Sequence, residues 1–220
     1  MRSHIVVVLC GAGLALILNG CPRKGDSIPV GPTSPSETSL NHAVGTRLVY
    51  SLTRTTNDEP DGVETVTLTV LSRTDQNGTV SILTNDERID VRWVLSNGRL
   101  SMVAPDTEYT QVIGPWPATK DQTFSEVRRL VSDDGSEVQQ DTLVYRVLNA
   151  DTLVTTNAGQ FRCAHVEITQ PGLPLGYWSI TRYLYNGSIG LIQQNTEVLA
   201  TFGTFEIATK QLLVLDNILR

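Results

Sequence analysis

Short stretches of alternating apolar and polar residues follow one another along most of the chain from residue 46 onward. Val66, Leu68 and Val70, for example, alternate with threonines. Side chains at every second position of a strand share one face, so this period predicts strands with one face on a core and one toward water. No 3.6-residue helical period is sustained here. The predicted strands lie near residues 46–56, 63–72, 79–84, 88–95, 99–103, 124–131, 137–147, 151–156, 160–169, 177–185, 189–196, 200–206 and 210–216.

Turn dipeptides separate many of these stretches. Asp61-Gly62, Asn77-Gly78, Asn97-Gly98 and Asp134-Gly135 each offer residues that accept the positive φ angles of a tight hairpin. Hairpin-linked strands form antiparallel sheets, whereas parallel strands need long crossover connections. The sequence therefore predicts an all-β fold, a curved antiparallel meander that forms an open barrel or half-barrel. A two-sheet β-sandwich is the alternative.

The N-terminal residues have a different pattern, because residues 5–18 form an almost uninterrupted apolar run. This run is short for a bilayer span but has the length of the apolar helix of an export signal. It ends in Leu18-Asn19-Gly20-Cys21, which resembles the lipobox of bacterial lipoproteins. In that motif an aliphatic and a small residue guide the signal peptidase, and the cysteine thiol accepts a diacylglycerol. The alternative is an ordinary secretory signal in which Cys21 is incidental.

The segment that follows is rich in Pro, Gly, Ser and Thr and has no apolar period, as in a disordered linker. We therefore expect residues 1–20 to be a signal peptide, residues 21–41 a lipidated disordered tether, and residues 42–220 the β domain. Acyl chains on Cys21 would attach the protein to a membrane of the bacterial envelope. The expected location is the outer membrane, facing the periplasm or the cell surface.

Charge and cysteine content narrow the choice of partners. The chain carries 17 basic and 23 acidic residues, a formal net charge of −6. An acidic surface opposes nucleic-acid binding by charge alone, so no nucleic-acid partner is expected. Of the three cysteines, Cys10 lies in the predicted signal, and lipidation of Cys21 would leave Cys163 without a disulfide partner. We expect Cys163 to be buried as a small apolar residue.

Three phrases in the predicted β domain resemble a broad group of bacterial lipoproteins with a curved antiparallel sheet. The first is residues 45–50, where Leu48 replaces the usual aromatic of Gly-x-x-Trp-x-Tyr. The second is residues 155–163, which contain Ala-Gly-x-Phe-x-Cys. The third is residues 185–192, which match Tyr-x-x-Gly-x-Gly-Leu-Ile in part. Members of the group look like the half-barrel of the Lol-type carriers, which hold lipoprotein acyl chains. The resemblance therefore implies a half-barrel and, by analogy of fold alone, an apolar ligand.

Candidate catalytic chemistry is sparse. His165 has Cys163 and Glu167 two residues away on either side, but such neighbours on a strand lie about 7 Å apart. Structural zinc also needs four ligands, and no second pair is evident. Nucleophile-elbow, zinc-protease, phosphate-loop and dinucleotide motifs do not occur. We expect no catalytic residue, no metal and no cofactor, and a hydrolase is the least favoured function.

Two loops carry apolar residues that predict a binding role. Trp116 lies between prolines, and Leu173 and Leu175 lie in the Pro- and Gly-rich segment 171–176 that precedes Trp178. We expect these four side chains near the mouth of the half-barrel, where they would contact an apolar ligand or a segment of an envelope protein. Alternatively, Trp116 fills the core and the leucines cover a sheet edge. The chain would then be a structural or assembly lipoprotein with a filled sheet.

The lipobox yields a direct test. Cys21→Ser removes the thiol that the acyl group needs, so we expect unprocessed precursor without lipid. Metabolic labelling with a clickable fatty acid, read on gels beside the wild-type protein, measures both. Label retained by the Cys21→Ser variant would show that Cys21 is not the lipidated residue.

Overall fold

The structure is a computed structural model that describes residues 40–77, 79–85, 90–104, 109–131, 137–173, 177–202 and 204–220. The predicted signal peptide, with Leu18, Asn19 and Gly20, and the predicted lipid attachment at Cys21 lie outside these residues. The described part contains strands and turns without a helix, and so it offers no helical segment able to cross a membrane.

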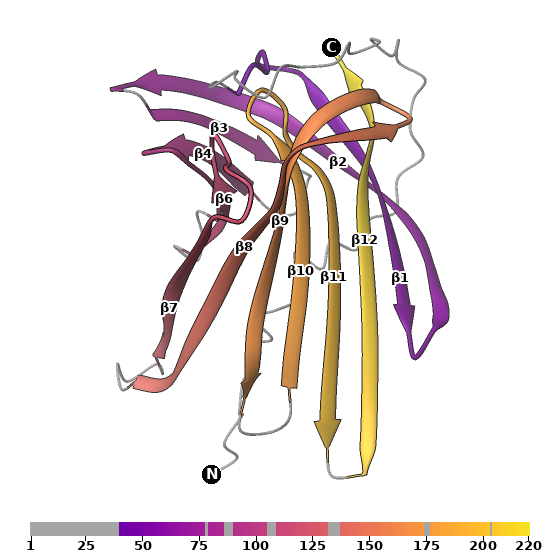
Figure 1. Ribbon diagram of the computed structural model, residues 1–220. Coiled ribbons are helices and arrows are strands. Elements are labelled where there is room, and N and C mark those ends of the chain that lie inside the picture. The colour runs from indigo at the N-terminus through magenta and orange to yellow at the C-terminus, as the bar shows by residue number, and fades with distance from the viewer. Residues whose placement is uncertain are drawn as a thin grey trace, which may run out of the picture.

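Twelve strands make up the described fold (Figure 1). They are β1 (Arg47–Thr56), β2 (Glu59–Gln76), β3 (Thr79–Asn85), β4 (Asp90–Ser96), β5 (Arg99–Ala104), β6 (Tyr109–Pro115), β7 (Thr123–Val131), β8 (Glu137–Thr156), β9 (Gly159–Leu173), β10 (Tyr177–Asn186), β11 (Gly190–Phe202) and β12 (Phe205–Leu219).

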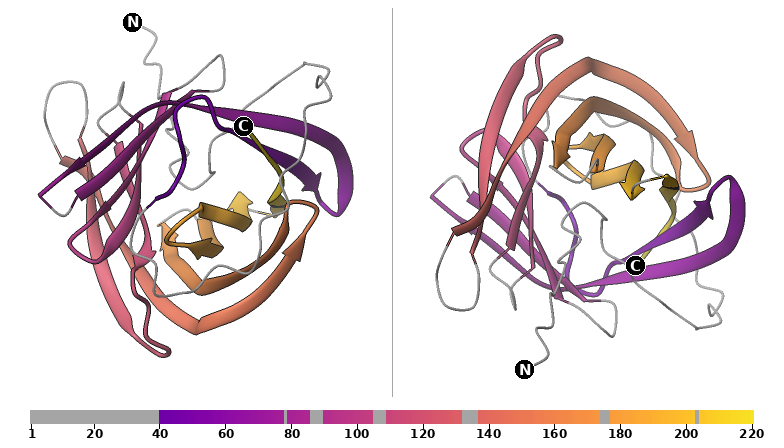
Figure 2. Two further views of the ribbon diagram at one scale, coloured as in Figure 1. Left: turned by 90° about the horizontal axis from the view of Figure 1, so that it is seen from above. Right: turned by 90° about the horizontal axis from the view of Figure 1, so that it is seen from below.

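All twelve strands belong to one antiparallel sheet with the order β6-β5-β4-β3-β2-β1-β12-β11-β10-β9-β8-β7. The first and last strands pair with each other at its centre, and the consecutive strands β6 and β7 form its two edges. Views along the strands show that the sheet curls around an interior, so its edges approach without joining in a ladder (Figure 2). The predicted open half-barrel is confirmed, and the sandwich alternative is wrong because the described strands form a single sheet.

Three of the strand predictions need correction. The predicted strands 137–147 and 151–156 are one long strand, β8, whose register shifts between Val147 and Thr152 accommodate the residues that separated the two predicted strands. The predicted strand 200–206 is divided between the end of β11 and the start of β12. Strand β6 was not predicted, because its paired apolar residues Val112 and Ile113 interrupt the period of two.

The hairpin turns are only partly those that the dipeptides predicted. Asn97 and Gly98 form the β4–β5 turn with φ angles of 50° and 68°. Between β1 and β2, however, the positive φ angles belong to Asn57 and Asp58, whereas the predicted turn at residues 61–62 lies within β2. Asn and Asp tolerate left-handed backbone better than other non-glycine residues, so they can replace glycine in such a turn.

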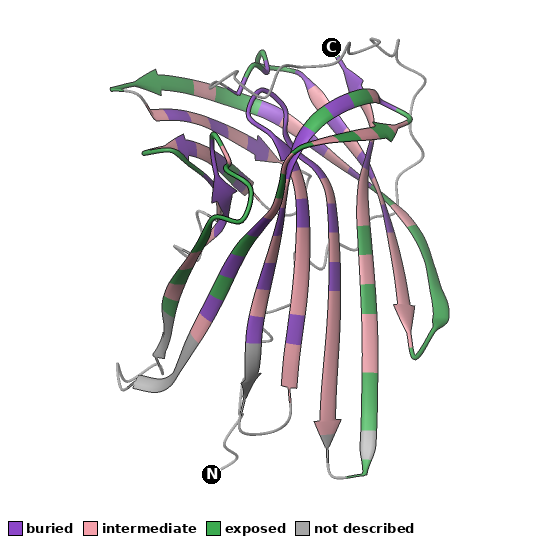
Figure 3. Cartoon of the chain, viewed as in Figure 1, coloured by how far each residue is buried: buried purple, intermediate pink, exposed green. Residues whose placement is uncertain are grey.

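The core fills one end of the half-barrel, which we call the capped end (Figure 3). Here the turn at residues 187–189 meets the first described residues, since the Asn41 amide donates to the Ser188 carbonyl at 2.7 Å. Leu40 is only 1% exposed, so the folded part includes residues that we assigned to the tether. The tip of the β8–β9 hairpin also reaches this end, where Asn157 hydrogen-bonds Asp216 at 3.1 Å.

Tyr185, near the end of β10, joins the capped end to edge strand β6. Its buried hydroxyl donates to the Pro115 carbonyl at 2.6 Å, and its ring packs against Trp116 with 5.9 Å between centroids. Gly114 allows this approach, because a Cβ at that position would lie 2.9 Å from the Cζ of Tyr185. Glycine is therefore required at residue 114 by packing rather than by backbone conformation.

Side chains, rather than main-chain bonds, link the two edges of the sheet. Gln111 of β6 donates from Nε2 to the Tyr145 hydroxyl at 3.2 Å, and that hydroxyl donates to Glu126 of β7 at 3.1 Å. Arg99 approaches the same carboxylate at 3.5 Å and lies 5.0 Å from the ring centre of Phe124. These side chains bridge the two edge regions, which no main-chain ladder joins among the described strands.

Gly114→Ala should lower the free energy of unfolding by about 1–3 kcal/mol, because the added methyl group overlaps the Tyr185 ring. Chemical denaturation of the two proteins measures this difference. Combining the change with Tyr185→Phe should reduce its cost, since the nearest overlapping atom is the hydroxyl oxygen. Equal costs in both backgrounds would contradict the close approach of Gly114 and Tyr185.

Candidate functional site

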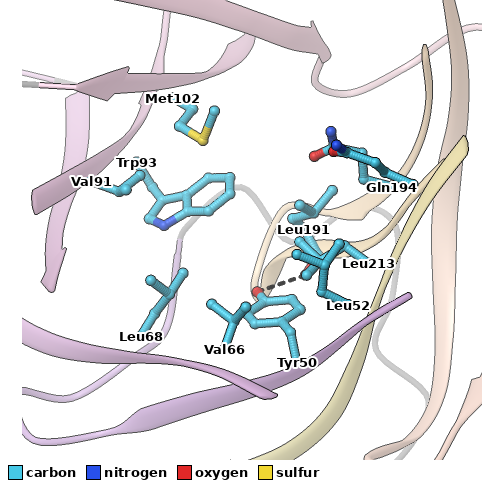
Figure 4. A pocket seen from close by; sticks show the side chains of 11 residues that line it. Tyr50, Leu52, Val66, Leu68, Val91, Trp93, Met102, Leu191, Gln194 and Leu213 are labelled. Carbon is cyan, nitrogen blue, oxygen red and sulfur yellow. Dashed lines mark hydrogen bonds between the residues drawn. The ribbon is translucent and has the colours of Figure 1, made fainter. Parts of the chain in front are cut away.

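A partly enclosed pocket on the concave face of the sheet is the strongest candidate site (Figure 4). Its cavity volume is about 50 Å³, and six strands contribute to its walls. The lining residues are Tyr50, Leu52, Val66, Leu68, Val91, Trp93, Met102, Leu191, Gln194, Gln211 and Leu213. Nine of these side chains are mainly apolar and none is charged, so the pocket suits an apolar group.

Strand pairing explains how these residues come together. Leu52 of β1 lies directly opposite Leu213 of β12, which in turn lies opposite Gln194 of β11. Directly opposed residues of an antiparallel pair point to the same face, so these three side chains all point into the half-barrel. On the far wall, Trp93 of β4 similarly opposes Met102 of β5. The pocket thus exists only because the ends of the chain pair at the centre of the sheet.

Tyr50 closes one side of the pocket. It is 1% exposed, and its hydroxyl donates to the Leu191 carbonyl at 3.0 Å. Burial raises the pKa of the Tyr50 hydroxyl well above its ordinary value, because the phenolate would lose its hydration. The side chain therefore remains a neutral hydrogen-bond donor and does not add charge to the pocket.

Polar residues border the pocket on the side away from the capped end. Gln194 donates to Thr196 at 3.1 Å, and Thr196 lies opposite Gln211. Arg54 of β1 lies opposite Gln211 on the other side, so Thr196, Gln211 and Arg54 form a row across three strands. Arg54 also pairs with Glu64 at 3.3 Å. The concave face therefore changes from apolar to polar between the pocket and the open end. The charges of Arg54 and Glu64 at this border neutralise each other.

The structure separates the four residues that the sequence grouped at a mouth. Trp116 is 2% exposed and packs on Tyr185 at the capped end, as in the alternative core assignment. Trp178 is half-buried at the other end of β10, about 23 Å along the strand from Tyr185 at 3.3 Å per residue. The backbone of Leu173 pairs with Tyr177, but its side chain is not described, and Leu175 lies outside the described residues. Their binding role stays a prediction.

Sequence reasoning did not assign a site role to the residues that line the pocket. Trp93 and Leu68 were expected in strands with one buried face, and both are buried. The alternation could show that they point inward, but it could not show which inward residues face an unfilled space. That depends on pairing between distant strands, for which the sequence carries no local signal.

Burial and ion pairing shape the ionisable groups around His165. Cys163 is fully buried, and its thiol pKa is raised to about 12. Burial is the main cause, and the negative charge of nearby Asp151 adds to it. Burial and the Arg182 charge lower the pKa of His165, while Glu167 is paired with Arg182 at 2.9 Å. Among the described residues, no three His, Cys, Asp or Glu side chains are arranged to hold a metal ion.

Several solved structures resemble this chain. One is a candidate exported protein with a YmcC-like fold from Bacteroides fragilis, at 13% identity and a TM-score of 0.52, with 83% of this chain and 99% of that one covered. The chain therefore shares the YmcC-like fold. No protein-family model matches the sequence, and no curated protein matches it significantly.

Two more distant structures were also found. A candidate lipoprotein from Parabacteroides distasonis has 12% identity and a TM-score of 0.48, with 81% and 97% of the two chains covered. The hypothetical lipoprotein YmcC from Escherichia coli has 11% identity and a TM-score of 0.34, with 78% and 83% covered. At these identities a likeness concerns the fold alone, so the resemblance to the Lol-type carriers stays a prediction.

Cys163 should be almost inert in the native protein. Because its pKa is about 12, native Cys163 should react with iodoacetamide at pH 8 roughly a thousandfold more slowly than in denaturant. Peptide mapping by mass spectrometry follows this residue separately from the other cysteines. Rapid native labelling would contradict its burial.

Proposed function

We propose that this protein is a lipid-anchored, non-enzymatic protein of the bacterial envelope whose half-barrel binds the apolar end of a ligand or of a partner segment. The observation that carries the binding role is the partly enclosed apolar pocket on the concave face. An apolar group that enters such a pocket leaves water, and this transfer favours binding.

The lipobox-like sequence at Cys21 supports the anchor. The sequence predicts a tether over residues 21–41, which would link the lipid to the β domain. A flexible chain of that length spans about 24 Å on average. The half-barrel would then lie close to the membrane surface, within reach of envelope lipids and membrane proteins. We propose the outer membrane, facing the periplasm or the cell surface.

The size of the pocket limits what it can hold. A cavity of about 50 Å³ is well below the 300–1,000 Å³ of pockets that enclose a drug-sized molecule. It can hold a few heavy atoms, such as a chain end or part of one apolar side chain. The remainder of the ligand would then lie along the concave face toward the open end, where the bordering residues are polar.

The same small volume favours a second candidate, a structural or assembly lipoprotein that uses its outer face or an edge. Its support is the core of the capped end, which Tyr145, Phe161 and Tyr185 fill without exposure to solvent. In that case the pocket would be a packing imperfection without a ligand. The non-enzymatic role in both candidates is supported by the buried thiol of Cys163, whose raised pKa keeps it protonated.

Filling the pocket distinguishes the two candidates. Leu213→Trp should abolish binding of n-hexane, a small apolar probe, because the indole would occupy the cavity. Leucine and valine methyl NMR shifts measure the binding. The matched control is Leu212→Trp on the opposite face of β12, where Leu212 is 38% exposed, and this variant should bind n-hexane normally.

Leu213 is half-buried, so its replacement should cost only about 1 kcal/mol of stability, which thermal melts can verify. If the wild-type protein does not bind n-hexane, or if both variants bind it equally, the pocket is not a binding site and the structural role is favoured. Mass spectrometry of lipids retained by the wild-type protein and the two variants extends the comparison to natural ligands.

A further inference from the structure

The indole N–H of Trp93 is the one polar group of the apolar wall that has no hydrogen-bond partner among the described residues. Trp93 is 5% exposed, and its nitrogen faces Leu68 and Val66, two other residues that line the pocket (Figure 4). A buried donor that loses water without gaining an acceptor is costly, so native proteins rarely keep one. A ligand with an acceptor at this position would remove that cost.

We propose that the pocket recognises a neutral acyl ester, whose carbonyl oxygen accepts a hydrogen bond from the Trp93 indole. This inference rests on the proposed binding function and specifies the chemistry of the ligand. The ester carbonyl would lie against Trp93 with its nearest carbons in the cavity, and the rest of the ligand would pass Gln194 and Gln211 on the opposite side of the pocket.

The absence of charge in the lining favours a neutral ligand over an anion. The lining residues include glutamines but no acidic or basic side chain. Arg54 at the polar border is already paired with Glu64 at 3.3 Å, so its charge is largely neutralised. A carboxylate that entered the pocket would lose its hydration without gaining an opposite charge, which strongly disfavours its binding.

The surroundings of Trp93 favour an ester over an amide or an alcohol. An indole nitrogen can donate a hydrogen bond but cannot accept one. Among the pocket side chains drawn around the indole nitrogen in Figure 4, Leu68, Val66 and Val91 have no polar atoms. An amide or alcohol at this place would bring its own N–H or O–H into an apolar wall, whereas an ester oxygen only accepts and leaves no donor unpaired.

The test compares small probes whose apolar end can enter the cavity while the remainder lies along the concave face. Methyl pentanoate offers a carbonyl acceptor, whereas n-hexane has neither an acceptor nor a charge. Pentanoate carries a negative charge, and N-methylpentanamide adds an N–H donor beside its carbonyl. We would titrate each into the chain from residue 21, with Cys21→Ser, which retains every strand of the sheet. Nitrogen-15 NMR observes the indole N–H groups directly, and Trp93→Phe identifies the signal of Trp93.

We expect methyl pentanoate to move the Trp93 indole proton downfield, and pentanoate to bind much more weakly. Trp93→Phe should lower the ratio of ester to n-hexane affinity about fivefold, the effect of one lost hydrogen bond. Using the ratio removes the effect of the space that phenylalanine leaves. The control Leu212→Phe, at an exposed position on the opposite face of β12 and outside the pocket, should leave the ratio unchanged.

An unchanged ratio in Trp93→Phe would overturn the ester inference, as would binding of pentanoate or N-methylpentanamide as tight as that of the ester. If n-hexane still bound in those cases, the proposed apolar site would remain and only its chemical specificity would be wrong. If neither n-hexane nor the ester bound to the wild-type protein, both proposals would fail.

Discussion

The hydrogen bond from the Tyr185 hydroxyl to the Pro115 carbonyl holds the last residue of β6 against β10, from which it is far removed in the sheet order. Both groups are buried, and a buried backbone carbonyl without a donor would be costly. The bond therefore holds the edge strand against β10 at the capped end. Gly114 and Trp116 adapt to it, the first by lacking a side chain and the second by packing on the ring.

With this bond in place, side chains close the half-barrel between its two edge strands, and no ladder of main-chain hydrogen bonds joins these strands. Edge strands β6 and β7 are consecutive in the chain, yet their contacts pass through Gln111, Tyr145 and Glu126. Side-chain contacts can separate at less cost than a row of main-chain bonds. The sheet thus combines a densely packed end with an edge-to-edge seam. The pocket lies between the strands β1, β2, β11 and β12 on one side and β4 and β5 on the other.

The concave face is organised by polarity along the strands. Next to the packed core comes the apolar pocket, and beyond it a row that includes Thr196, Gln211 and the Arg54–Glu64 pair. An amphiphile could place its apolar end in the first zone and its polar part in the second without leaving a charge unpaired. The Trp93 donor adds a directional contact within the apolar zone. These features are the basis of the proposed binding role.

What the sequence determined by itself was local. The period of two identified most strands, Asn97-Gly98 marked a real turn, and Cys163 was correctly expected in the core. The tertiary structure alone decided that residues as distant as Leu52 and Leu213 become neighbours, and that Trp116 packs at the capped end. Alternation shows which face of a strand is buried, but pairing depends on the combined energy of all strands. The pocket forms between strands from both ends of the chain, so only the folded sheet could reveal it.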